Sequence, residues 1–490
     1  MPSANDPMQT IVELYARGAY ADALAFAVPL LARRHKKNVE LMNVAAACAR
    51  AQGDLIEAEA LWRRAVTLNP AFADGHCNLG LVLKDMGRYK SAENACRRAL
   101  KLQPRHVDAL NNLGNLLKSS GRFAEAEVAY RKIIRIQPDH AGAYNNLGNL
   151  LRDLGRDAEA EATYRSGMAL RPDFSETEMN LGALKLAQGD FTAGWSHHEA
   201  RCLAPGMPQP SAGCPRWTGQ ELTGKSLLIG PELGFGDEIQ FVRYLPLLKA
   251  AGARHITLVC RRPLKALFET LSGVDRLLAA DEPAAANLPL HDYWSLLLSI
   301  PRYLGTDAHS IPATLPYLHA LPERIAHWRS RLPASGFRVG LVWQGNRQHR
   351  NDHHRSLADL AVLRPLWKVP GTAFVSLQKE PERFLASPAE QPLLSLGPEL
   401  RDFADTAALI AGLDLVISVD TSVAHLAGAL GQPCWVLLPM MGTDWRWLRQ
   451  RDDSPWYPRV MRLFRQTDPR DWTSTVATLA AALHERVHPS

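Results

Sequence analysis

The chain has 490 residues and only seven cysteines, an odd number that includes no Cys-x-x-Cys pair. Neither a disulfide framework nor a cysteine-based zinc site is therefore expected, and the thiols are expected to be reduced. No stretch approaches the roughly 18 consecutive apolar residues that a membrane-spanning helix requires. The N-terminal segment lacks a basic start followed by an apolar run, so we expect no signal peptide. Together these absences predict a soluble, cytoplasmic protein.

A strong excess of one charge is also absent. The 56 basic and 50 acidic residues leave a net charge of +6, and no run of five or more like charges occurs. A nucleic-acid-binding surface is therefore not indicated. A chain of this length exceeds what one hydrophobic core can hold, so we expect several domains.

The N-terminal part contains a repeat with a period of 34 residues. Four prolines recur at this spacing, and the tripeptide Asn-Leu-Gly, a turn glycine and a small alanine recur in step with them. This pattern is typical of the tetratricopeptide repeat (TPR), a helix–turn–helix unit that stacks into a solenoid. We expect an all-α solenoid over residues 1–203, with clear repeats at 39–174 and degraded repeats on both sides. The recurring residues are Pro70, Pro104, Pro138 and Pro172; Asn-Leu-Gly at 78–80, 112–114, 146–148 and 180–182; Gly53, Gly87, Gly121, Gly155 and Gly189; and Ala58, Ala92, Ala126 and Ala160.

The repeated asparagines fall on the first helix of each unit, which lines the concave face of such arrays. They are Asn78, Asn112, Asn146 and Asn180. Each side-chain amide offers a donor and an acceptor that match one peptide unit of an extended chain. A row of them is predicted to bind a polypeptide acceptor whatever its sequence. The alternative is that asparagine is simply common at this position and helps to cap neighbouring turns.

Residues 204–224 are rich in proline, glycine and serine, which indicates a linker. Short apolar runs then alternate with helical patterns, as in parallel, doubly wound α/β sheets. We expect two Rossmann-like domains, 225–333 on the acceptor side and 334–490 on the nucleotide-sugar side, with a break near Leu332–Gly336. The predicted strands are Ser226–Ile229, His255–Val259, Arg338–Trp343, Ala373–Leu377, Leu415–Val419, Cys434–Leu438 and Met461–Phe464.

Ligands of such sheets bind beyond the carboxyl ends of the strands. The first strand is followed by Gly234, Gly236 and Asp237, two glycines that let a ligand approach the backbone and an acid at a helix start. The segment lacks the third glycine of a dinucleotide-binding GxGxxG motif. A polar loop from Asn346 to Ser356 follows Arg338–Trp343. Its histidines are adjacent rather than one helical turn apart, which favours anion binding over a metal site.

Two further strand ends carry polar side chains. Gln378 and Lys379 follow one strand, whereas Asp420, Thr421, Ser422 and His425 follow the next. The hydroxyl groups fall in the first turn of a predicted helix, where free N–H groups and the positive end of the helix dipole favour phosphate. The alternative is an ordinary helix cap provided by Asp420.

Five segments carry a family resemblance: GFGDEIQFVRY, GLVWQGN, SLQKE, DFADTAALIAGLDLVISVDTSVAHLAGALGQPCWVLLP and DWRWLRQRDDSPWYPRVMRLFRQ. They resemble bacterial TPR-containing glycosyltransferases, relatives of the lipopolysaccharide heptosyltransferases with the two-Rossmann GT-B fold. The resemblance extends over residues 190–485. Repeats that precede a GT-B pair are also similar in layout to the protein O-GlcNAc transferases.

The resemblance implies roles for single residues. Asp237 matches the catalytic base of the heptosyltransferases. Relatives usually read Gln-Gly before the Gly-Asp pair, whereas Glu232-Leu233-Gly234 stands here before Phe235. The implied donor-binding residues are Gly234, Gly236, Asn346, Arg355, Gln378, Lys379, Asp420, Thr421, Ser422 and His425.

The expected activity is transfer of a sugar from a nucleotide-sugar to an acceptor hydroxyl. No metal or cofactor is expected, because no DxD motif follows a strand and Asp452-Asp453 falls in a loop; inversion is the expected outcome. The asparagines favour a protein acceptor held by the repeats. One alternative is a transferase that extends lipopolysaccharide or another surface glycan, with the repeats binding partners. The other is a scaffold with an inactive transferase domain. The presence of Asp237, Lys379 and Asp420-Thr421 argues against it.

Overall fold

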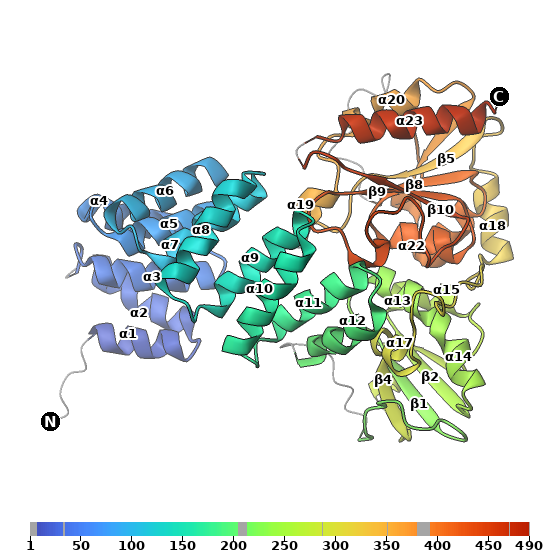
Figure 1. The fold of residues 1–490 in the computed structure, drawn as a ribbon, viewed down its shortest axis with the longest axis horizontal. Coiled ribbons are helices and arrows are strands. Elements are labelled where there is room, and N and C mark those ends of the chain that lie inside the picture. The colour runs from blue at the N-terminus through green and yellow to red at the C-terminus, as the bar shows by residue number, and fades with distance from the viewer. Residues whose placement is uncertain are drawn as a thin grey trace. The chain divides into compact units, whose positions relative to one another are not determined.

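The computed structural model describes residues 7–32, 35–203, 213–286, 288–349, 351–379, 393–469 and 471–489 (Figure 1). The chain divides into two compact units, Met1–Phe174 and Ser175–Ser490. The predicted linker at 204–224 lies outside the described residues as far as residue 212. All seven cysteines are free thiols, as expected.

The first unit is a stack of helix pairs, which confirms the TPR solenoid. The turn glycines adopt the left-handed conformation, with φ of 74° at Gly87 and 73° at Gly121, because a tight reversal between antiparallel helices requires it. Pro104 and Pro138 follow directly on the capping residues of the second helices. The helices are α1 (Pro7–Ala16), α2 (Tyr20–Ala32), α3 (Val39–Ala51), α4 (Leu55–Leu68), α5 (Ala73–Asp85), α6 (Tyr89–Leu102), α7 (Val107–Ser119), α8 (Phe123–Ile136), α9 (Ala141–Asp153) and α10 (Asp157–Leu170).

The glycine of each Asn-Leu-Gly tripeptide lets the paired helices touch. A Cβ atom on Gly114 would lie 2.6 Å from the ring of Tyr130, and one on Gly148 would lie 2.4 Å from the ring of Tyr164. Both rings are buried. Any larger residue at these two positions would force the helices apart, which explains why the glycine recurs with the repeat.

The second unit begins with one more helix pair, α11 (Ser175–Ala187) and α12 (Phe191–His198), followed by the 3-10 helix η1 (Glu199–Leu203). These helices share a hydrophobic core with the α/β part of the chain. The indole of Trp195 donates a 2.9 Å hydrogen bond to the carbonyl of Thr306, and its ring packs edge-on against Trp445. The expected solenoid boundary at residue 203 therefore does not coincide with the boundary between the compact units, because the last helix pair is packed into the second one.

Two parallel sheets lie on either side of residues 332–336. The first has the strand order β3-β2-β1-β4, and the second has the order β10-β9-β8-β5-β6-β7. All seven predicted strands are confirmed, and β3, β4 and β7 were not predicted. The strands are β1 (Ser226–Gly230), β2 (His255–Cys260), β3 (Arg276–Ala279), β4 (Tyr293–Leu296), β5 (Phe337–Val342), β6 (Thr372–Ser376), β7 (Leu393–Ser395), β8 (Leu415–Val419), β9 (Cys434–Leu438) and β10 (Met461–Arg465).

Helices cover both faces of the second sheet (Figure 1). The helices α21 (Phe403–Ile410) and α22 (Ser422–Ala429) share one core with it, whereas α20 (Arg364–Trp367) and α23 (Thr473–Val487) share another. This is the doubly wound α/β arrangement expected from the sequence, and two such parallel sheets agree with a GT-B-like fold. The carboxyl ends of β5, β6, β8 and β9 are consequently the places to look for a ligand site.

Candidate active site

Asp237 lies in the first turn of α13 (Phe235–Phe241), directly after the loop that follows β1. The backbone N–H of Gly234 donates a 2.6 Å hydrogen bond to Oδ2 of Asp237, so the acid caps its own helix. Leu233 before it is half exposed and has φ of 53°, which is uncommon for leucine. The guanidinium of Arg261 holds this loop by donating a hydrogen bond to the carbonyl oxygen of Leu233.

The second oxygen of Asp237 is engaged by a residue from the other sheet's domain. Nη2 of Arg446, in the 3-10 helix η8 (Trp445–Trp447), donates to Oδ1 of Asp237. Nη1 of Arg446 donates to both oxygens of Asp444, at 2.9 and 3.0 Å. Sequence reasoning assigned no role to Arg446 or Asp444. Their only signal was the alternation of charged residues with buried tryptophans in the segment DWRW.

The start of α22 lies against the Asp237 loop. A Cβ atom on Gly236 would lie 2.8 Å from the ring of His425 and 3.4 Å from Cα of Ser422, so only glycine allows α13 and α22 to approach so closely. The predicted residues Gly236, Ser422 and His425, which are far apart in the sequence, are thus brought together.

The residue that caps α22 is Thr421, so the alternative of an Asp420 cap is wrong. No side chain caps the helix: the hydroxyl of Thr421 is hydrogen-bonded to the hydroxyl of Ser418 at 3.0 Å. Asp420 instead contributes its carbonyl oxygen, which accepts a 3.0 Å hydrogen bond from Nη1 of Arg355. Thr421 and Ser422 retain some solvent exposure. The first turn of α22 is therefore partly accessible to solvent.

The electrostatics of this site depend on burial. Burial and the charge of Asp444 raise the pKa of Asp420 to about 6, although Arg355 opposes the shift. Burial, and then the charge of Arg446, lower the pKa of His425 to about 3, so its imidazole is neutral. Nδ1 of His425 is hydrogen-bonded to the hydroxyl of Tyr457 at 2.9 Å, and its ring stacks on Trp447.

The remaining predicted donor residues lie at the neighbouring strand ends. Oε1 of Gln378 accepts a 3.1 Å hydrogen bond from the backbone N–H of Gln344, which ties the ends of β5 and β6 together. Asn346 and Lys379 are exposed. Within the described residues, no hydrogen bond or ion pair joins either of them to the start of α22. Arg350 of the same polar loop as Asn346, and Glu380 next to Lys379, lie outside the described residues.

The four predicted acceptor-binding asparagines lie on the first helices of their repeats. Three of them form side-chain hydrogen bonds to the first helix of the preceding repeat. Nδ2 of Asn78 donates to Oδ1 of Asn43 at 2.9 Å, and Nδ2 of Asn146 donates to Oδ1 of Asn111 at 2.8 Å. Nδ2 of Asn112 lies 3.4 Å from Sγ of Cys77. Asn180 belongs to the second unit. The asparagines therefore have a structural part in the solenoid whatever else they bind.

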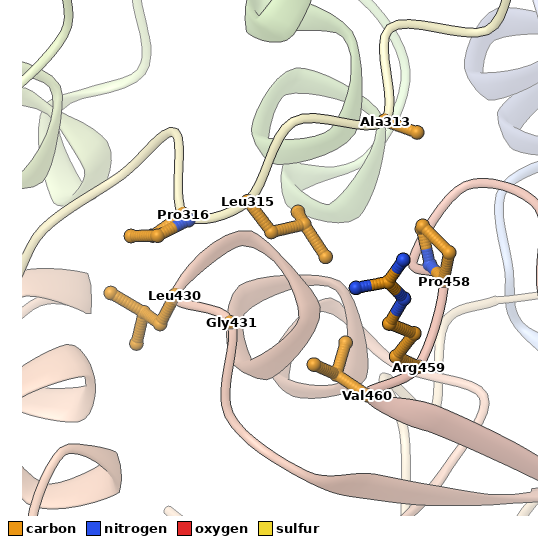
Figure 2. A pocket seen from close by; sticks show the side chains of 8 residues that line it. All are labelled: Ala313, Leu315, Pro316, Leu430, Gly431, Pro458, Arg459 and Val460. Atoms are coloured by element: carbon orange, nitrogen blue, oxygen red, sulfur yellow. The ribbon is translucent and has the colours of Figure 1, made fainter.

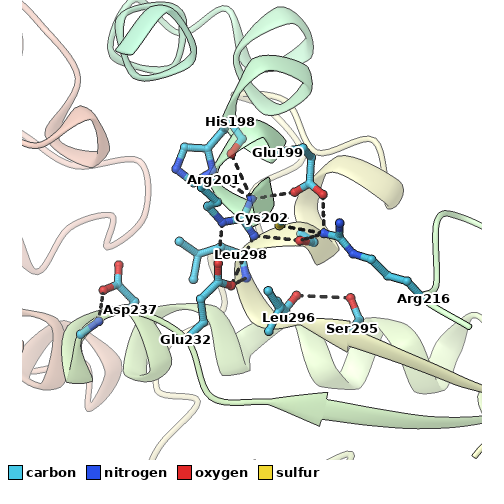
Figure 3. A network of polar contacts seen from close by, with 12 residues as sticks. His198, Glu199, Arg201, Cys202, Arg216, Glu232, Asp237, Ser295, Leu296 and Leu298 are labelled. Atoms are coloured by element: carbon cyan, nitrogen blue, oxygen red, sulfur yellow. Dashed lines mark hydrogen bonds and ion pairs between the residues drawn. The ribbon is translucent and has the colours of Figure 1, made fainter. Parts of the chain in front are cut away.

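A buried ion network joins the end of the last helix pair to the loop between β1 and α13 (Figure 3). Nε of Arg201 donates to Oε1 of Glu232 at 2.5 Å, and its Nη1 donates to Oε1 of Glu199 at 2.7 Å. Oε2 of Glu232 also accepts a 3.1 Å hydrogen bond from the backbone N–H of Leu298. Arg201 and Glu232 are each about 1% exposed, so the two opposite charges compensate each other in an interior that water does not reach. The Glu232 that departs from the family pattern is therefore matched by an arginine from the end of the repeats.

An open cavity of about 480 Å³ lies at the opposite end of α22 from Thr421 (Figure 2). Leu430, Gly431 and Val460 line it together with Leu315, and Arg459 is its charged residue. None of the predicted donor-binding residues lines this cavity. It is separate from the site at the helix start.

Among the described residues, no group of three or more His, Cys, Asp or Glu side chains is arranged to hold a metal ion. Asp453, considered above with Asp452, is paired with Arg451 at 2.7 Å. The described helices also include none that is both long and apolar enough to cross a bilayer. The tryptophans of the C-terminal segment are buried and belong to the core: Trp435, Trp445, Trp447, Trp456 and Trp472.

Comparison with known proteins agrees with both halves of this description. Models described as tetratricopeptide repeat match residues 49–87, 77–141 and 117–176, and the model of glycosyltransferase family 9 (heptosyltransferase) matches residues 376–437. Protein FlbA of Caulobacter vibrioides is 31% identical over 325 residues, which cover 61% of this chain and 53% of that protein. The chain thus spans about half the length of this curated relative.

The similar solved structures include TPR proteins. One from Parabacteroides merdae is 19% identical with a TM-score of 0.37, and the match covers 42% of this chain and 82% of that one. A thermophilic TPR protein from Thermus thermophilus is 20% identical with a TM-score of 0.33, covering 37% of this chain and 97% of that one. The family 9 match contains Gln378, Lys379, Asp420, Thr421, Ser422 and His425. The chain therefore joins tetratricopeptide repeats to a segment of the glycosyltransferase family 9 (heptosyltransferase) type.

Proposed function

We propose that this protein transfers a sugar from a nucleotide-sugar donor to an acceptor hydroxyl, with inversion and without a metal ion or cofactor. The observation that carries the proposal is the contact of Gly236 with Ser422 and His425. It brings the acid-bearing loop of one sheet to the helix start of the other, and that helix start lies inside the family 9 match. A donor diphosphate at Thr421 and Ser422 would present its sugar to Asp237.

The chemistry follows from what each group offers. As the acceptor oxygen forms its bond to the anomeric carbon, the bond from that carbon to the nucleotide diphosphate breaks and the acceptor proton passes to Asp237. Negative charge develops on the departing diphosphate, which the N–H groups at the start of α22 and the side chains of Arg355 and Lys379 would stabilise. Loss of one such donor typically lowers the rate on the order of 10²-fold.

For the acceptor, we propose a polypeptide held along the asparagine-bearing helices of the repeats. Three of these asparagines already donate one N–H to a neighbouring helix, so the peptide would use their remaining donor and acceptor positions. A surface glycan is the second candidate acceptor, supported by the heptosyltransferase description of the matching family.

Nucleotide binding tests the proposed donor site. UDP, GDP, ADP and CMP are added in turn, and at least one should raise the melting temperature of the protein, because a ligand that binds only the folded state stabilises it. Thr421→Ala combined with Ser422→Ala should abolish that shift and leave the melting temperature without nucleotide nearly unchanged. A matched control is Thr467→Ala with Ser474→Ala, which removes a hydroxyl pair of the same domain that lies 3.2 Å apart and is exposed. If the first double variant keeps the full shift, the donor binds elsewhere.

A further inference from the structure

Arg446 has a donor group that finds no acceptor in the described part of the chain. Its side chain is 7% exposed, and its Nη atoms donate hydrogen bonds to Asp237 and Asp444. Its Nε–H is buried and has no hydrogen-bond partner among the described residues. A buried N–H without an acceptor is unfavourable, so an acceptor from outside the chain would be favoured there.

The position of Arg446 indicates what that acceptor is. The guanidinium donates a hydrogen bond to Asp237. Gly236, the residue directly before Asp237, packs closely against Ser422 in the first turn of α22. The carboxylate of Asp420, the residue before the helix cap, is close enough to act on the charge of Arg446. Arg446 therefore lies beside the helix start at which we placed the donor phosphates. Arginine is the side chain best suited to bind phosphate through several N–H groups at once.

We propose that Arg446 is shared between Asp237 and the donor: it pairs with Asp237 in the empty enzyme, and the phosphate groups of the donor draw it away from that carboxylate. The inference rests on the proposed function. Its consequence is an order of events, because Asp237 is released to accept the acceptor proton only once the anionic donor is bound. The same arginine then stays with the phosphates as they depart.

A double-mutant cycle with inorganic pyrophosphate as the probe tests this competition. Dissociation constants are measured by calorimetry for the full chain, Asp237→Asn, Arg446→Gln and the double variant. Asp237→Asn should bind pyrophosphate about tenfold more tightly than the unaltered protein, because the competitor for Arg446 is gone. Arg446→Gln should bind it about tenfold more weakly, and adding Asp237→Asn to Arg446→Gln should change little.

The double variant separates competition from simple charge repulsion. If Asp237→Asn tightened binding equally with and without Arg446, the carboxylate would act by repelling the anion directly and the inference would be overturned. An unchanged affinity in Asp237→Asn would overturn it as well, while leaving the donor site intact. An unaltered protein that does not bind pyrophosphate would overturn the donor site and this inference together.

Two further variants guard against misfolding. Arg446→Lys keeps the charge but makes only point contacts, so pyrophosphate affinity should lie between those of the unaltered protein and Arg446→Gln. If Arg446→Gln does not fold, the cycle is closed with Arg446→Lys, in which Asp237→Asn should then tighten binding less. Asp453→Asn breaks the exposed pair with Arg451 and should leave the affinity unchanged.

Discussion

Asp420 holds a proton over a pH range in which an ordinary aspartate has lost it. Its pKa is raised to about 6 by burial and by Asp444, against an ordinary value of about 3.9. Between these two values the folded protein binds a proton that the unfolded chain does not. The contribution of Asp420 to the free energy of unfolding therefore falls as pH rises through that interval. His425 acts in the opposite direction, because its lowered pKa leaves it neutral where the unfolded chain is protonated.

We predict that Asp420→Asn removes this pH dependence while His425 keeps its own. The melting temperature of Asp420→Asn relative to the unaltered protein should rise by a few degrees from about pH 4 to about pH 6 and then stay level. His425 is present in both proteins, so its effect cancels from the difference. Thermal melts followed by circular dichroism at half-unit steps of pH provide the measurement. A difference that does not vary with pH would show that Asp420 is ionised throughout.

The sequence could locate the residues that stand just after long apolar strands, but not their partners. Asp237 and Thr421 follow β1 and β8, so the rule that ligands bind at the carboxyl ends of strands was enough to find them. Arg446 lies 209 residues from Asp237 and sits in a three-residue 3-10 helix with no hydrophobic period. Only the tertiary fold brings the two together. The same applies to Arg201 and Glu232.

At the scale of elements, the asparagines on α5, α7 and α9 have two separable effects. We predict that the triple change of Asn78, Asn112 and Asn146 to alanine lowers the melting temperature modestly, because each lost hydrogen bond between neighbouring helices contributes about 0.5–1.5 kcal/mol. It should also lower the transfer of labelled sugar to protein, with hydrolysis of the donor unchanged.

The control removes hydrogen bonds of the same repeats without touching the asparagine row. Tyr130→Phe with Tyr164→Phe deletes two 2.7 Å bonds, from the tyrosine hydroxyls to Asn115 and Asn149. This variant should lose stability to a similar extent but keep transfer to protein. Equal transfer by the asparagine and tyrosine variants would mean that the asparagines stabilise the solenoid but do not bind the acceptor. The glycan acceptor would then be favoured.

The strands that the sequence failed to predict share a position in the sheets. β3, β4 and β7 are all edge strands, and none exceeds four residues. A central strand of a parallel sheet is covered on both faces and reads as a continuous apolar run, as β8 does with all five residues buried. β7 is partly exposed along its whole length, so its pattern does not stand out from a loop.

At the scale of the whole molecule, the division after Phe174 predicts which shortened proteins fold. A protein that begins at Ser175 retains Leu186, Phe191 and Trp195 in the common core, whereas one that begins at Ala204 loses all three. Loss of a buried aromatic side chain alone costs about 3–5 kcal/mol. We expect 175–490 to melt cooperatively and to bind nucleotide, and 204–490 to aggregate or melt without a sharp transition.

Differential scanning calorimetry of the two proteins, with and without nucleotide, makes the comparison. As a control, a protein beginning at Ala141 should behave as 175–490 does, because it adds only helices of the first unit. Cooperative melting of 204–490 would contradict the shared core. Transfer to protein by 175–490 at the level of the full chain would instead remove the first unit from acceptor binding.

The buried pair of Arg201 and Glu232 limits how such proteins can be recombined. A foreign solenoid joined directly to residue 204 would leave Glu232 without its arginine in the interior, a loss of about 3–5 kcal/mol in the loop that precedes α13. A junction at Ser175 avoids this, since the native segment from Ser175 to Leu203 then stays with the rest of the second unit. Solenoids of different length or surface could then be exchanged before an unchanged second unit. If the repeats hold the acceptor as proposed, such an exchange should change the acceptor preference while the proposed site at Asp237 and Thr421 stays the same.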